Sequence, residues 1–140
     1  ERCRETCLSI PGAAGRRFTP RPGDAGAGLR VAVSAPGAEA AHSPRTGDVE
    51  MRARLVKRPS IDGRARVGAR LVARTGRWAG TKLALSPRWL RCRGSCVDVG
   101  RGRTYGVRAR DGGHRLVLEV VASNSLGSVT SRSRPTARVR

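Results

Sequence analysis

The sequence predicts an all-β protein with antiparallel sheets, and three observations lead to this fold class. Several short runs alternate apolar and polar residues, which is the period of a strand with one buried face. The 140 residues include 18 glycines and 8 prolines, which favour many turns over long helices. A series of residues near the start of the chain also returns in the same order near its end, as in proteins built from repeated units.

The alternating runs place the strands and the core. Strands are predicted at residues 28–35, 69–74, 88–92, 104–107, 115–123 and 129–139. Clusters of Gly with Asp or Asn separate these runs, and such spacing over roughly 80 to 100 residues is typical of an antiparallel sandwich. The side chains expected in its core are Leu71, Trp89, Tyr105, Leu116, Leu118 and Val120. Trp78 falls in a glycine-rich stretch that predicts a turn.

Two copies of one pattern, offset by 87 to 90 residues, divide the chain. The matched residues are Cys3, Cys7, Phe18, Asp24, Leu29, Ser43, Thr46 and Val49 in the first copy and Cys92, Cys96, Tyr105, Asp111, Leu116, Ser133, Thr136 and Val139 in the second. The second copy has an upstream half, from Pro59 to Trp89, that the first lacks. We therefore expect the C-terminal half of a repeat at 1–49, a linker at 50–58 and a complete domain at 59–140.

The second copy resembles the Ig-like repeats of secreted and surface proteins from high-GC bacteria of the actinobacterial type. The resemblance is carried by Pro59, Ile61, Gly63, Val67, Gly68, Leu71, Gly76, Trp78, Trp89, Arg91, Cys92, Cys96, Tyr105, Asp111, Gly113, Leu116, Ala122, Asn124 and Gly127. It implies an immunoglobulin-like β-sandwich, complete in the second copy and half present in the first, in tandem arrays on extracellular proteins. One departure is Pro87, which cannot donate to a ladder and predicts a strand that begins at an edge or after a kink.

The four cysteines form two Cys-x₃-Cys pairs, Cys3 with Cys7 and Cys92 with Cys96. Each pair could close a small disulfide at a turn, which predicts an oxidising compartment and an extracellular or cell-surface location. The alternatives are free thiols or one zinc ion held by all four thiolates. Disulfides are favoured because zinc sites more often use a Cys-x₂-Cys spacing, and because a repeat places the two pairs in equivalent turns of different units.

The chain carries a net charge of +19, and nearly all of its basic residues are arginines. This composition is typical both of GC-rich codon usage and of a surface that attracts anionic polymers. Near the end of the chain, Arg132, Arg134, Arg138 and Arg140 recur at mainly even spacing and are expected to line one face. Such a face could bind phosphate, sulfate or uronate groups. The alternative is a solvated outer face that keeps the sheet edge from pairing with other chains.

The sequence contains no recognised motif for catalysis or for cofactor binding. His42 and His114 are the only histidines, and neither belongs to a Ser/His/Asp or Cys/His pattern. Asp24 and Asp111 each precede a glycine by two residues. This pattern predicts that their carboxylates accept backbone N–H groups in a turn and do not bind calcium. No apolar run approaches the ~18 residues of a membrane span. We therefore expect a protein that is not an enzyme and needs no cofactor.

The function expected from these features is that of a non-catalytic extracellular structural or adhesive module in a repeat array or fibre. Its partners would be neighbouring Ig-like repeats or identical subunits. A half repeat would leave Leu29, Val31 and Val33 exposed to water, so either the chain is a fragment of a longer array or another subunit supplies the missing strands. The alternative function is a basic binding module for anionic surface polymers, either cell-wall glycan or nucleic acid.

Overall fold

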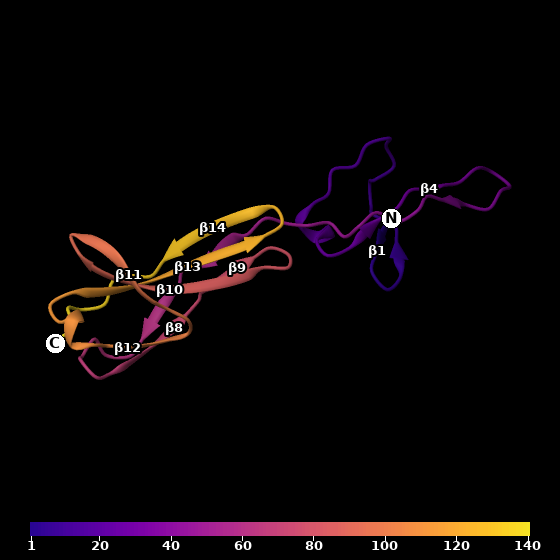
Figure 1. Ribbon diagram of the computed structural model, residues 1–140. Coiled ribbons are helices and arrows are strands. Elements are labelled where there is room, and N and C mark those ends of the chain that lie inside the picture. The colour runs from indigo at the N-terminus through magenta and orange to yellow at the C-terminus, as the bar shows by residue number, and fades with distance from the viewer. The chain divides into compact units, whose positions relative to one another are not determined.

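The computed structural model describes residues 1–140, which form two compact units, Glu1–Met51 and Arg52–Arg140. We call them the N-terminal unit and the C-terminal unit. Both are all-β with antiparallel pairing, which confirms the predicted fold class (Figure 1). The only helices are two 3₁₀ turns, η1 (Pro22–Asp24) and η2 (Ala109–Asp111). No helix is long and apolar enough to cross a membrane.

The C-terminal unit contains two main sheets and a short strand pair. Its strands are β6 (Arg54–Lys57), β7 (Ser60–Asp62), β8 (Arg70–Arg74), β9 (Arg77–Ala79), β10 (Ala84–Arg93), β11 (Ser95–Arg101), β12 (Thr104–Gly106), β13 (Arg115–Asn124) and β14 (Gly127–Arg132). One sheet has the order β11-β10-β13-β14, the other has the order β12-β8-β7, and β6 pairs with β9.

The two sheets of the C-terminal unit share one hydrophobic core. Trp89 and the inward residues of β13 come from the first sheet, and Leu71 and Tyr105 come from the second. All six side chains that the sequence places in the core are buried. The indole of Trp89 stacks on Tyr105 with 5.6 Å between ring centroids, and its Nε1 donates to the carbonyl of Gly102 at 3.0 Å. Trp89 therefore packs as a core residue, as the sequence predicts.

The C-terminal unit begins at Arg52, earlier than the expected domain start at Pro59. Residues 54–57, expected in a linker, form β6 and pair with β9, so Trp78 lies in a strand and not in a turn. The two strands continue the β7–β8 hairpin beyond a break at Gly76. At this glycine φ is +81°, and an added Cβ would lie 2.2 Å from the carbonyl oxygen of Lys57, so a side chain has no room.

Pro87 lies inside β10, which begins four residues earlier than the predicted strand at 88–92. β13 pairs with β10 from Ala84 onward, whereas β11 joins on the other side only from Arg88. The carbonyl of Pro87 accepts the N–H of Gly102 on the β11 side, at 3.1 Å. The missing N–H of Pro87 therefore faces the side where the ladder ends, so Pro87 lies at an edge of the sheet but within the strand and not at its start.

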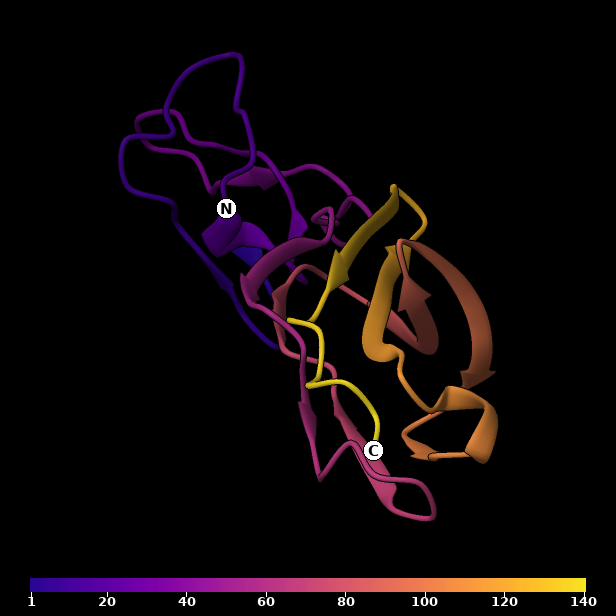
Figure 2. The same ribbon diagram turned by 90° about the vertical axis from the view of Figure 1, so that its left-hand side faces the viewer.

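The last predicted strand, 129–139, ends early, because β14 stops at Arg132. Beyond it, the N–H groups of Ser133, Thr136 and Val139 donate to the carbonyls of Leu118, Leu116 and His114. This segment thus advances three residues for every two in β13, so it is not a regular ladder. Even spacing therefore does not define one face there, and Figure 2 shows the segment, in yellow, running beside the magenta β7–β8 hairpin.

The N-terminal unit has a three-stranded sheet and a separate strand pair. The sheet has the order β2-β1-β3, and β4 pairs with β5. These strands are β1 (Arg2–Cys3), β2 (Cys7–Leu8), β3 (Gly28–Leu29), β4 (Ala32–Val33) and β5 (Ala41–His42). The strand predicted at 28–35 is therefore divided into β3 and β4. Val31 and Val33 are 61% and 62% exposed, as the sequence predicts, whereas Leu29, also expected to be exposed, is half-buried.

Candidate functional site

Both cysteine pairs form disulfides, one in each unit. Cys3–Cys7 joins β1 to β2, and Cys92–Cys96 joins β10 to β11 across the hairpin turn. No cysteine is free, so the alternative of a zinc ion held by four thiolates is not available in this state. The two disulfides occupy equivalent places, since β1 lies between β2 and β3 as β10 lies between β11 and β13.

Asp111 is fully buried at the end of η2 and ties three segments together. Its carboxylate accepts the hydroxyl of Tyr105 at 2.9 Å and the backbone N–H of Arg108 at 2.8 Å. The guanidinium of Arg91 lies 3.4 Å from the same carboxylate. Burial, together with the hydrogen bond to Asp111, raises the pKa of Tyr105. Asp111 is therefore a turn former, and its bonds to Tyr105 and Arg91 extend that role to the sandwich core.

Asp24 repeats this arrangement in the N-terminal unit. It is fully buried at the end of η1, and its carboxylate accepts the backbone N–H of Arg21 at 2.7 Å and the side chain of Arg2 at 2.7 Å. The backbone hydrogen bond from Arg21 and the bond and charge of Arg2 outweigh desolvation, so the pKa of Asp24 is lowered. Phe18 replaces Tyr105 in this copy and has no hydroxyl to donate.

A third shared feature is the edge made by Ser, Thr and Val at intervals of three. Ser133 and Thr136 accept the N–H groups of Leu118 and Leu116, each at 3.0 Å. In the N-terminal unit the same bonds join Ser43 to Val31 and Thr46 to Leu29, each at 2.9 Å. Each hydroxyl also donates to the carbonyl of the next residue in its own chain segment. The offset of 90 residues in the sequence thus corresponds to matching contacts.

Glu119 is the one buried acid on the face of β13 that points away from the core, with 2% of its surface exposed. It lies directly opposite Arg88 of β10 and Arg132 of β14, and both guanidinium groups donate to its carboxylate. Desolvation would raise the pKa of Glu119, but the hydrogen bonds from Arg132 and Arg88 outweigh it, so the pKa is lowered. Arg132 is therefore held in an internal ion pair and does not belong to a free anion-binding face.

We expect Glu119→Gln to destabilise the C-terminal unit by about 1 to 2 kcal/mol at pH 7, discounted because both arginines are partly solvated. Because the folded pKa of Glu119 is lowered, its contribution is complete above the unfolded pKa, about 4.3, and is lost as the pH falls through the folded pKa. Urea unfolding of the unchanged chain and of Glu119→Gln is measured between pH 3 and 7. The difference between their free energies of unfolding should shrink as the pH falls. A difference that is constant with pH would contradict this role of the carboxylate.

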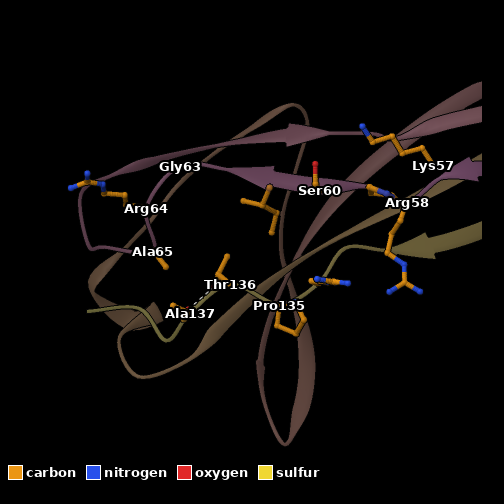
Figure 3. Close-up of a pocket in the computed structure, with 12 residues that line it drawn as sticks. Lys57, Arg58, Ser60, Gly63, Arg64, Ala65, Pro135, Thr136 and Ala137 are labelled. Carbon is orange, nitrogen blue, oxygen red and sulfur yellow. Dashed lines mark hydrogen bonds between the residues drawn. The ribbon is translucent and has the colours of Figure 1, made fainter.

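A groove lies between β7 and the segment after β14, and basic side chains surround it (Figure 3). Its lining includes Lys57, Arg58, Ser60, Ile61, Arg64, Arg134, Pro135 and Thr136. The picture places Arg64 at one end and Lys57 with Arg58 at the other. The groove stays open because Pro135 has no N–H, and because the N–H groups of Ser133 and Thr136 point to β13.

The cations that line the groove differ from those of the basic face that the sequence predicts. Of the four arginines expected on that face, only Arg134 lines the groove, while Arg138 and Arg140 lie outside its lining. None of its four cations has an ion pair with a carboxylate, unlike Arg88 and Arg132. Sequence reasoning missed Lys57, Arg58 and Arg64, since two of them fall in the expected linker. The only feature of the sequence that could have indicated them is the high density of Lys and Arg residues in the range 57–66.

The chain was compared with protein-family models, with curated proteins and with solved structures. None of the three comparisons finds a match. The features that bear on function are thus those of the chain itself: the duplicated disulfide hairpin, the duplicated buried aspartate and the unpaired cations of the groove.

Proposed function

We propose that the chain is a non-catalytic structural or adhesive segment of an extracellular array of immunoglobulin-like repeats, of the bacterial type that the sequence resembles. The order of strands in the C-terminal unit supports this fold. In the standard lettering of this fold, β7, β8 and β12 would be strands A, B and E of one sheet. The other sheet, β11-β10-β13-β14, would be C′, C, F and G. The order of strands in each sheet then matches that of an Ig-like sandwich. A tryptophan on strand C, buried against the opposite sheet, also belongs to that fold.

The observation that carries the proposal is the duplication of three sets of contacts. The disulfide hairpin, the buried aspartate and the edge of Ser, Thr and Val occur in both units, at sequence offsets of 87 to 90 residues. An enzyme needs one constellation of side chains, whereas duplicated scaffolding contacts are typical of arrays in which each unit repeats one design. The two disulfides support a non-reducing compartment, which for an array means the cell surface or the medium.

The oxidation state of the cysteines tests the compartment. Intact mass is measured after treatment of the unfolded chain with an alkylating reagent, with and without prior reduction. We expect no label before reduction and four labels after it. Replacing Cys92 and Cys96 with serine should destabilise the C-terminal unit by about 2 kcal/mol, the loop-entropy value for so short a loop. Four labels without reduction would contradict the extracellular array.

A second candidate is a binding module for anionic polymers, and the groove between β7 and the segment after β14 favours it. Its four cations are free to pair with sulfate, phosphate or uronate groups, and the hydroxyls of Ser60 and Thr136 lie beside them. No aromatic side chain lines the groove, and Trp89 and Tyr105 are buried. Single-stranded nucleic acids usually stack on aromatic residues, so the lining favours an anionic glycan.

Binding at increasing salt distinguishes the two candidates. A groove-directed binder should retain an immobilised polyuronate or sulfated glycan and lose roughly tenfold or more in affinity between 50 and 200 mM salt. The double variant Lys57→Ala with Arg134→Ala should then bind at least about tenfold more weakly, whereas the charge-matched control Arg138→Ala with Arg140→Ala should change little. A purely structural segment should retain no glycan at physiological salt. Equal losses in both double variants would indicate diffuse charge and contradict a groove site.

A further inference from the structure

We infer that the groove between β7 and the segment after β14 binds an extended acidic segment of a partner protein, which adds to β7 as a further β-strand. This inference rests on the proposed adhesive function and names the class of partner that the protein would engage. Four features of the groove carry it. One wall is an unpaired strand edge, the other wall has unpaired N–H groups, part of the lining is apolar, and the cations around it have no carboxylate partners.

One wall of the groove is the outer edge of β7, which pairs only with β8. The N–H of Ala73 in β8 donates to the carbonyl of Arg103, so Ala73 directs its backbone groups toward β12 and away from β7. Ile61 lies directly opposite Ala73, and in an antiparallel ladder such a pair exchanges no hydrogen bonds. The N–H and the carbonyl of Ile61 therefore point away from β8, to the side of the groove that Ile61 lines.

The opposite wall is the segment that follows β14. The N–H groups of Ser133 and Thr136 donate to carbonyls of β13. The N–H groups of the next residues in each case, Arg134 and Ala137, form no hydrogen bond within the chain. Because successive N–H groups of an extended chain point to opposite sides, these two point away from β13, toward the groove. Both walls thus offer backbone groups to a strand placed between them, as in strand addition to a sheet edge.

The apolar part of the lining comes from small side chains. Ile61 and Ala65 pack against the hydrophobic core, and Pro59, Pro135 and Ala137 complete this part of the lining. An added strand would direct every second side chain toward these residues. Small branched side chains such as valine suit such a surface, since no aromatic ring is present in the lining.

The remaining side chains of an added strand would lie near the cations. The cations of the groove are Lys57, Arg58, Arg64 and Arg134, which are all exposed and have no ion pair with a carboxylate. Asp62, the acid of β7, already pairs with Arg74 at 2.6 Å. Carboxylates on the partner would therefore complement the charge of the groove. The charge alone also suits an anionic glycan, but a glycan has no ladder of alternating N–H and carbonyl groups, so the walls favour a peptide.

The experiment adds a synthetic peptide of alternating valine and glutamate, about eight residues long, to the full oxidised chain. Calorimetry measures the affinity, and NMR follows hydrogen exchange of the Ile61 N–H. We expect saturable binding and at least about tenfold slower exchange at Ile61, because a peptide carbonyl accepts this N–H. A control peptide with alternate backbone nitrogens methylated keeps the charge but loses ladder donors, so it should bind at least about tenfold more weakly. A peptide of alternating valine and lysine should not bind.

The double variant Arg64→Ala with Arg134→Ala tests the protein side of the contact. Both side chains are exposed, so the fold should persist while the acidic peptide binds at least about tenfold more weakly. The charge-matched control, Arg138→Ala with Arg140→Ala, removes two arginines from outside the groove and should change the affinity little.

No binding of the acidic peptide, or binding that leaves exchange at Ile61 unchanged, would overturn the inference. Equal affinity of the methylated peptide would also overturn it, because the groove would then recognise charge and not a strand. A polyuronate that binds more tightly than the peptide and depends on the same two arginines would assign the groove to a glycan instead. Equal losses in the two double variants would assign the binding to diffuse charge. The labelling of cysteines is independent of these outcomes, so the array proposal can stand or fall separately.

Discussion

Trp89→Ala should lower the free energy of unfolding of the C-terminal unit by about 3 to 5 kcal/mol, the largest loss from any single substitution proposed for this protein. The side chain is fully buried between the two sheets, where it stacks on Tyr105 and donates to Gly102. Its removal leaves a large cavity, and it also leaves the carbonyl of Gly102 without its indole donor. Few other aromatic side chains are present to fill the space, since the whole chain has two Trp, one Tyr and one Phe.

Both tryptophans belong to the C-terminal unit, so their fluorescence during urea unfolding reports on that unit alone. In Trp89→Ala the remaining reporter is Trp78. The matched control is Trp78→Ala, which removes a half-buried indole from β9 and should cost clearly less, about 1 to 3 kcal/mol. If Trp78→Ala destabilised the unit as much as Trp89→Ala, the core would not be centred on Trp89.

Asp111→Ala should cost about 3 kcal/mol in the same unit, although the substitution removes only a carboxylate. The side chain is fully buried and accepts from the Tyr105 hydroxyl and the Arg108 backbone, with the Arg91 guanidinium beside it. Without the carboxylate, a buried hydroxyl and a partly buried N–H lose their acceptor. The cost comes mainly from these unpaired donors rather than from lost attraction.

Urea unfolding followed by tryptophan fluorescence also measures this effect. The control is Asp62→Ala, because the ion pair between Asp62 and Arg74 is solvent-exposed and should contribute only about 0.5 kcal/mol. Asp111→Asn keeps an acceptor for the Tyr105 hydroxyl. This substitution should therefore lower the free energy of unfolding by only about half as much as Asp111→Ala does. A cost of Asp111→Ala no larger than that of Asp62→Ala would show that the buried aspartate does not hold η2 to the core.

The sequence was sufficient for the features that depend on local pattern. The alternation along residues 115–123 predicted β13 and its buried side chains, because a half-buried strand places every second residue on one face. The spacing of Cys92 and Cys96 predicted a disulfide across a turn, and the hairpin of β10 and β11 provides that turn. The missing upstream half of the first copy likewise predicted that Val31 and Val33 would be exposed.

The features that depend on contacts between distant segments could not be read from the pattern. β6 has no alternation of its own and exists because β9 pairs with it beyond the break at Gly76. The role of Glu119 follows from its cross-strand neighbours, which a single strand does not reveal.

The arginines show this division most clearly. Their number and their positions along the chain belong to the sequence, but the partner of each one is a matter of register and edge geometry. Arg132 pairs with a buried glutamate because β14 ends opposite Glu119, whereas Arg134 lines an open groove because the chain leaves the ladder at Ser133. The sequence alone thus determined the strand at 115–123, the duplicated cysteine pairs and the exposure of Val31 and Val33, since these arise from periodicity and repetition. The tertiary structure alone decided which charges are neutralised and which remain free, since ion pairs form across strands that are far apart in the chain.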